Sequence, residues 1–126
     1  MMQVHKIIEA ELKRLEDYQG GIEDYTKVIE LNPDDAVAYY NRGITKRNLG
    51  DYEGAIEDYT KAIELNPDDA SAYYDRGFTK DELEDYEGAI EDYTKVIELN
   101  PDYAVAYNNR GIAKSELEDY QGAIED

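Results

Sequence analysis

Residues 49–82 read LGDYEGAIEDYTKAIELNPDDASAYYDRGFTKDE, and residues 83–116 read LEDYEGAIEDYTKVIELNPDYAVAYNNRGIAKSE. The two 34-residue copies differ at nine positions, and the pattern Leu-X-Asp-Tyr also begins at residues 15 and 117. All three prolines keep the same spacing. Because a fixed period of about 20–50 residues is the mark of a repeat architecture, the sequence predicts a tandem array rather than a single globular core.

Each copy reads as two helices. In residues 52–65 the apolar side chains recur at steps of three and four, which is one face of a helix. Pro67 disfavours helical geometry in the residue before it, and Asp69 can cap the helix that follows. Extending this pattern predicts helices at 2–14, 18–31, 36–48, 52–65, 70–82, 86–99 and 104–116, with a stub from 120.

The first copy departs from the others at one close contact. Glu9 stands where the other copies have Gly, and Gly21 stands where all three of them have Ala. We interpret this exchange as a larger residue on one helix meeting a smaller one on its partner. Residues 2–14 are therefore expected to fold back as the first helix of the array. The expected buried residues are Val4, Ile8, Leu12 and Leu15.

The pattern resembles the tetratricopeptide repeat, whose signature sets an aromatic, Gly, Ala, an aromatic and Pro at fixed offsets. The residues that carry this resemblance are Tyr39, Gly43, Ala55, Tyr59 and Pro67, then Tyr73, Gly77, Ala89, Tyr93 and Pro101, and in the last copy Tyr107, Gly111 and Ala123. It implies an all-α superhelix, or solenoid, of helix-turn-helix repeats. We expect one domain, 1–126, with repeats at about 2–35, 36–69, 70–103 and an incomplete 104–126.

Two basic positions depart from the family pattern. Arg replaces a usual Leu before the Gly, and Lys replaces a usual Tyr four residues later, as in Arg42 and Lys46. We hypothesise that these cations form ion pairs with Asp58 and with its counterpart Asp92.

In this family the first helix of each repeat lines the concave side of the superhelix, where peptides bind. The resemblance assigns the following groove residues: Lys6, Val37, Tyr40, Asn41, Ile44, Arg47, Tyr74, Asp75, Phe78, Asn108, Asn109 and Ile112. Five of the nine differences between the two quoted copies fall on lining positions. This concentration favours a recognition surface, although free drift of exposed positions is the alternative explanation.

Charge and composition limit the classes of partner that the chain is expected to bind. With 31 acidic against 13 basic residues the net charge is -18, which disfavours nucleic acid and favours a peptide or protein segment of basic and apolar character. The family also has a clamp for C-terminal carboxylates, but Asp75 would repel such a group. No cysteine, signal-peptide core or membrane-spanning run occurs, so we expect a soluble, cytoplasmic protein.

Catalysis and cofactors have no support in the sequence. His5 is the only histidine, no Gly-rich phosphate loop occurs, and no nucleophile has a matching base. We therefore expect a protein that is not an enzyme, with no catalytic residue, metal or cofactor.

The two ends leave a rival function open. The last copy stops after Ala123 and Ile124, so the helix at 104–116 is expected to lack a cover, and repeat arrays normally need a polar cap. The alternative to peptide binding is a self-assembling module, either a dimer or a head-to-tail stack. Residues 1–14 carry a net charge of +1 and the remainder -19, which favours stacking. A truncated or engineered array would also explain these ends.

Overall fold

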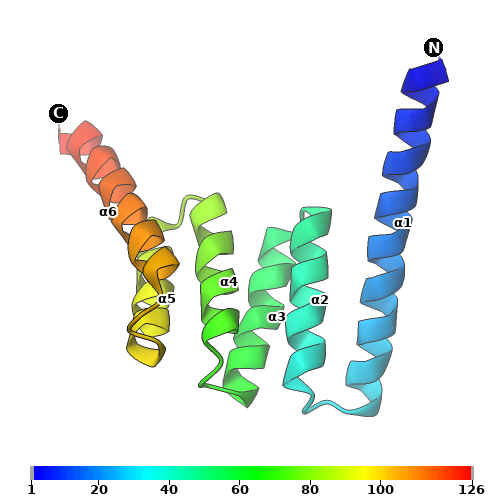
Figure 1. Ribbon diagram of the computed structural model, residues 1–126, viewed down its shortest axis with the longest axis horizontal. Coiled ribbons are helices and arrows are strands. Elements are labelled where there is room, and N and C mark those ends of the chain that lie inside the picture. The colour runs from blue at the N-terminus through cyan, green and yellow to red at the C-terminus, as the bar shows by residue number, and fades with distance from the viewer. Residues whose placement is uncertain (1, 126) are drawn as a thin grey trace.

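The computed structural model describes residues 2–125, with side chains described as far as Gln121. It is all-α over these residues, as the sequence predicts. The helices are α1 (Met2–Leu31), α2 (Ala36–Leu49), α3 (Tyr52–Leu65), α4 (Ala70–Glu82), α5 (Tyr86–Leu99) and α6 (Ala104–Glu125). Successive helices stand beside one another in a row from α1 to α6 (Figure 1). In α2–α3 and α4–α5 the predicted helix pairs are confirmed.

Aspartate side chains cap the N-termini of the central helices, as the sequence predicts for Asp69. The Asp69 carboxylate accepts a hydrogen bond from the amide of Ser71 at 3.0 Å, and Asp85 accepts one from Gly88 at 3.1 Å. Within each pair the connection needs one left-handed residue, which is Gly50 with φ 97° after α2 and Glu84 with φ 64° after α4. Each cap satisfies an amide that the helix leaves unpaired.

The core lies between the helices of each pair. Tyr59 and Tyr93 are fully buried against the first helix of their own repeat. A Cβ atom added at Gly43 would stand 2.8 Å from the Tyr59 ring, and one at Gly77 would stand 2.9 Å from the Cβ of Asp92. Glycine is therefore required here for close approach, as the repeat signature predicts.

A buried ion-pair cluster repeats in both closed pairs, which confirms the hypothesis for the basic positions. The Arg42 guanidinium donates two hydrogen bonds to the Asp58 carboxylate, both at 2.8 Å, and Lys46 Nζ lies 3.1 Å from it. Arg76, Lys80 and Asp92 repeat this arrangement 34 residues later. Each arginine also donates to a threonine of the preceding repeat, so that the cluster joins successive repeats; one such bond runs from Arg42 to Thr26 at 3.1 Å.

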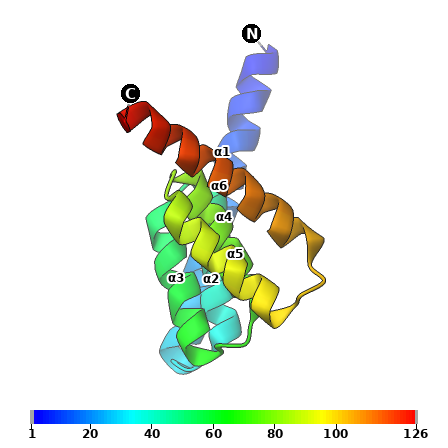
Figure 2. The ribbon, with the colours of Figure 1, turned by 90° about the vertical axis from the view of Figure 1, so that its left-hand side faces the viewer.

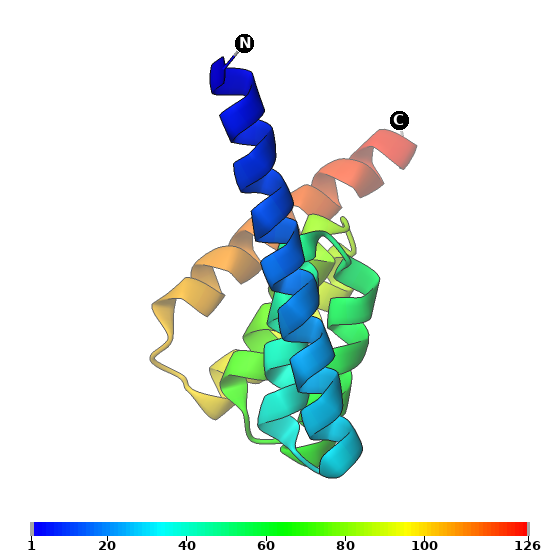
Figure 3. The same ribbon diagram turned by 90° about the vertical axis from the view of Figure 1, so that its right-hand side faces the viewer.

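The first helix pair is not formed, and that prediction is wrong. The expected helices 2–14 and 18–31 are one continuous helix, α1, whose N-terminal half projects past α2 (Figure 3). The residues expected to be buried are instead exposed: Val4 by 59%, Ile8 by 52% and Leu12 by 55%, with Leu15 only half-buried. Nothing in α1 folds back onto the half that holds residues 18–31.

The account of Gly21 and Glu9 is wrong for the same reason. An added Cβ at Gly21 would meet Thr45 of α2 at 3.6 Å, whereas Glu9 is exposed and pairs with His5 of its own helix at 2.9 Å. The two positions therefore do not compensate each other.

The last copy also forms one continuous helix instead of a helix pair. Residues 104–116 and the expected stub from 120 are joined in α6, which lies alongside α5 and extends beyond it (Figure 2). The side chains of Ala123 and Ile124 lie outside the described residues.

Candidate binding groove

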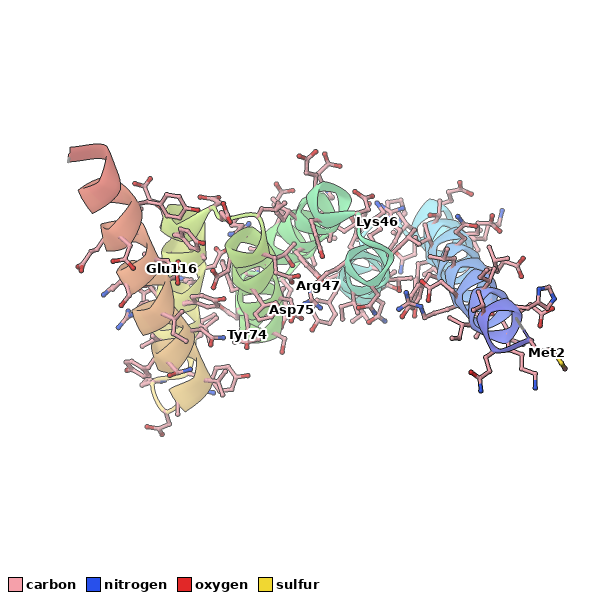
Figure 4. All side chains as sticks on the ribbon, turned by 90° about the horizontal axis from the view of Figure 1, so that it is seen from above. Met2, Lys46, Arg47, Tyr74, Asp75 and Glu116 are labelled. Atoms are coloured by element: carbon pink, nitrogen blue, oxygen red, sulfur yellow. The ribbon has the colours of Figure 1, made fainter. Side chains whose placement is uncertain are left out.

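Side chains from α2, α4 and α6 meet along one side of the row. In Figure 4, Arg47 and Asp75 lie between α2 and α4, with Tyr74 close by. Two hydrogen bonds connect the three helices: the Tyr40 hydroxyl donates to the Asp75 carboxylate, and the Asn109 amide donates to the Tyr74 hydroxyl at 3.0 Å. Each bond joins residues 35 positions apart, so the same connection is used twice between successive repeats.

Tyr74 is the centre of an aromatic cluster. Its ring lies 6.3 Å from that of Phe78, 5.9 Å from that of Tyr93 and 5.7 Å from that of Tyr103, centroid to centroid. Tyr93 is fully buried, whereas Tyr74 and Phe78 are half-buried. The cluster is therefore anchored in the core and presents an aromatic surface to solvent, which is the type of surface that contributes most to binding.

Arg47 adds a fixed cation to this surface. Its guanidinium lies 4.7 Å from the centre of the Phe78 ring and donates to the Glu82 carboxylate at 2.8 Å. The guanidinium is held by a cation–π contact on one side and a carboxylate on the other. Its charge is therefore largely neutralised by Glu82 before any ligand arrives.

A pocket of about 390 Å³ opens beside Tyr74. It is lined by Tyr40, Ala70, Ser71, Tyr74, Asp75, Asn100 and Tyr103. Tyr103 and Asn100 lie outside the predicted groove set, because the family pattern assigns ligand contacts to first helices and these residues belong to the turn after α5. One signal was present in the sequence: Tyr103 replaces the capping aspartate found at Asp69, so it gives up a structural role.

The electrostatics of the pocket favour a cation. Burial raises the pKa of the Asp75 carboxyl, while the hydrogen bond from Tyr40 opposes that rise. Burial, reinforced by the bond to Asp75, raises the pKa of the Tyr40 hydroxyl. The pocket therefore places the Tyr40 hydroxyl beside the Asp75 carboxyl, whose oxygens can accept hydrogen bonds from a basic side chain or an N–H donor.

The remaining predicted groove residues lie around this centre or away from it. Asn41 and Ile44 are half-buried on α2, and Val37, Asn108 and Ile112 are exposed on α2 and α6. Lys6 is exposed on the half of α1 that projects past α2, so the structure does not bring it to the groove.

Two further observations concern metal binding and membrane-spanning helices. No group of three or more His, Cys, Asp or Glu side chains suited to a metal ion occurs in the described part of the chain. Over the same residues no helix is sufficiently long and apolar to cross a membrane.

Paired antiparallel helices in a 34-residue period, with small residues at the crossing, define a helical-repeat protein. Models of the tetratricopeptide repeat match residues 11–35, 36–69, 58–91 and 82–118. The chain belongs to the tetratricopeptide repeat family. Domains of this family mediate protein–protein interactions and are typically non-catalytic.

Solved structures agree with this assignment. The crystal structure of MamA is 30% identical with a TM-score of 0.78, over 87% of this chain and 64% of that one. The first TPR of Spaghetti (RPAP3), bound to the HSP90 peptide SRMEEVD, is 28% identical with a TM-score of 0.77, over 92% of both chains. The Arabidopsis OM64 TPR domain is 27% identical with a TM-score of 0.74, over 79% of this chain and 83% of that one. The chain thus spans less than two thirds of the MamA chain, and no curated protein matches it.

Proposed function

We propose that this chain is a non-enzymatic scaffold that binds a protein segment of basic and apolar character in the groove formed by α2, α4 and α6. The observation that carries the proposal is the half-buried Tyr74, which is held by Asn109, stacks with Phe78 and meets Tyr103 edge to face at the edge of the pocket. An aromatic side chain fixed in this way offers a large contact area at little entropic cost.

The preference for a basic segment follows from the same pocket. In the described part of the chain Asp75 has no cation within 4 Å, and Arg47, which lowers the pKa of its carboxyl, is already paired with Glu82. The RPAP3 domain binds a peptide that ends in acidic residues. Two positions of a carboxylate clamp match in this chain, Lys6 and Asn41, but Lys6 does not reach the groove and Asp75 stands where a basic residue is needed. An acidic C-terminal tail is therefore expected to bind poorly.

The test uses an array of fluorescent 12-residue peptides with varied basic and aromatic content, with SRMEEVD included as the acidic comparison. Binders are expected at micromolar Kd, because aromatic anchors act here without a buried charge clamp. Tyr74→Ala and Phe78→Ala should each weaken binding by about tenfold or more, whereas Lys61→Ala on the exposed side of α3 should not. Binding that is insensitive to both groove variants, or a preference for SRMEEVD, would overturn the proposal.

Self-association is a second candidate function, and a specific observation favours it. Each terminal repeat forms one long helix instead of a helix pair. One helix face at each end of the row therefore lacks the packing partner that the same face has in the central repeats.

A further inference from the structure

The faces left open at the two ends of the row are complementary halves of one repeat. By the 34-residue period, residues 104–116 of α6 correspond to α2 and α4, which are first helices. Residues 18–31 of α1 correspond to α3 and α5, which are second helices. In the central repeats, helices of these two kinds pack against each other.

The open face of α6 contains a glycine with no neighbour. Nothing described lies within 4 Å of a Cβ added at Gly111, whereas the equivalent atom at Gly43 would meet the Tyr59 ring at 2.8 Å. The neighbouring Tyr107 is 45% exposed. The close-approach site of a repeat is thus present on α6 and unfilled.

The open face of α1 contains the side chains that fill such a site. Tyr25 corresponds to Tyr59 but is only half-buried, where Tyr59 is fully buried. Val28 is 40% exposed, although its counterparts Ala62 and Val96 are exposed by 1% and 0%.

The charges match in the same register. Arg110 and Lys114 on α6 correspond to Arg42 and Lys46, which hold Asp58 in the closed pair, and Asp24 on α1 corresponds to Asp58. Within the described residues neither cation has a carboxylate within 4 Å, and Asp24 has no basic partner. One face therefore carries the two cations of the cluster and the other carries its carboxylate.

We propose that α6 of one copy packs against residues 18–31 of α1 of a second copy, as α4 packs against α5. The contact places Arg110 and Lys114 on Asp24 of the second copy and Tyr25 of the second copy on Gly111. The inference rests on the self-association candidate and is independent of groove binding. It joins the copies into one continuous superhelix with an unbroken 34-residue period.

Folding the N-terminal half of α1 back onto residues 18–31 would satisfy Asp24 less well. In that pairing Ile8 and Leu12 take the positions of Arg42 and Lys46. Asp24 would then be buried beside two apolar side chains with no cation, which is strongly unfavourable for a carboxylate. The second copy is therefore the better cover.

The projecting ends of the helices do not obstruct this contact. In an antiparallel pair the end of residues 104–116 lies beside the start of residues 18–31, so the helical segments beyond them run on side by side. Both ends project from the same edge of the row (Figure 1). Residues 1–14 carry a net charge of +1 and residues 117–121 carry -2, which makes the two projecting segments attract rather than repel.

The contact joins different surfaces of the two copies, so it leaves one open face at each end of any assembly. Mass measured by light scattering at low ionic strength should therefore rise with concentration beyond a dimer. Arg110→Asp alone and Asp24→Arg alone should each weaken association by about tenfold or more, because like charges then meet across the contact. An equimolar mixture of the two variants should recover it, since every contact between unlike copies again joins opposite charges.

Two controls make the result specific. Lys95→Asp changes net charge as Arg110→Asp does, but Lys95 is a half-exposed residue of α5 that pairs with Glu98 of its own helix, and the change should leave association unchanged. Circular dichroism should show that each variant stays helical; if either does not, Lys114→Glu mixed with Asp24→Lys repeats the test. Association that Arg110→Asp does not weaken, or a mixture without recovery, would overturn this pairing but leave self-association standing. A monodisperse monomer at every concentration would overturn both, while binding of peptide to the groove remains a separate measurement.

Discussion

At the residue scale, the ion-pair cluster around Asp58 is expected to be a main source of stability within a repeat. Its carboxylate holds Arg42 and Lys46, and the side chain is only 5% exposed. Asp58→Asn keeps the shape but leaves both cations without a counter-charge, so we expect a loss of about 3 kcal/mol in the free energy of unfolding, measured with urea at pH 7. Asp24→Asn, at the equivalent exposed position, should stay within about 0.5 kcal/mol. Equal effects of the two substitutions would contradict this role.

Asp75 is expected to reduce stability at neutral pH. Burial raises the pKa of its carboxyl above the ordinary value of 3.8, so the folded chain binds the proton more tightly than the unfolded chain. The stability linked to this proton is present below pH 3.8 and is lost as pH rises through the folded pKa. Asp75→Asn should therefore be more stable than the parent chain at pH 7, with a smaller difference near pH 4.

The same substitution is compatible with the fold, because Asn109 occupies the equivalent position and bonds to Tyr74 as Asp75 bonds to Tyr40. Urea unfolding of both chains at several pH values measures the difference. A gap that is constant or grows toward low pH would show that Asp75 does not have a raised pKa.

At the element scale, glycine has opposite roles at equivalent positions. Gly43→Ala forces a Cβ against the Tyr59 ring at 2.8 Å, so we expect a loss of about 1–3 kcal/mol. Gly111→Ala enters open space and gains helix propensity, which should stabilise the monomer by up to about 1 kcal/mol. Thermal unfolding of dilute samples compares the two. Similar shifts of both midpoints in the same direction would rule out the close-approach account.

The limits of prediction from sequence are also clearest at this scale. The tetrapeptide Leu-Glu-Asp-Tyr forms a turn at 83–86 but stays helical at 15–18 and 117–120. The turn at 83–86 forces Glu84 into a left-handed conformation that costs roughly 1–2 kcal/mol, and it is supported by the ion pairs of Asp92 across α4 and α5. This support comes from side chains on the two helices that flank the turn, and not from the tetrapeptide itself. Periodicity therefore predicted the central helices and caps correctly but not the fate of the two end repeats.

The groove residues likewise include some that were predicted and one that was not. The family resemblance placed Tyr40, Tyr74, Asp75 and Asn109 on one side of the row, and the bonds from Tyr40 to Asp75 and from Asn109 to Tyr74 agree with that placement. The resemblance did not place Tyr103 there, because that residue belongs to a turn and contributes through its contact with Tyr74. A residue that replaces a helix cap within an otherwise faithful repeat is the sequence feature that would have indicated it.

At the scale of the whole molecule, stability and assembly should respond in opposite directions to a single methyl group. If residues 18–31 of a second copy cover α6, a Cβ at position 111 would collide with Tyr25 of that copy, as a Cβ at Gly43 collides with Tyr59. Gly111→Ala should then raise the melting temperature of the dilute monomer while weakening association by about tenfold, the equivalent of 1.4 kcal/mol. Ser115→Ala is the matched control, since it also favours the helix but lies on the groove side of α6, and it should leave association unchanged. Association that Gly111→Ala strengthens together with monomer stability would mean that α6 meets its partner through another face.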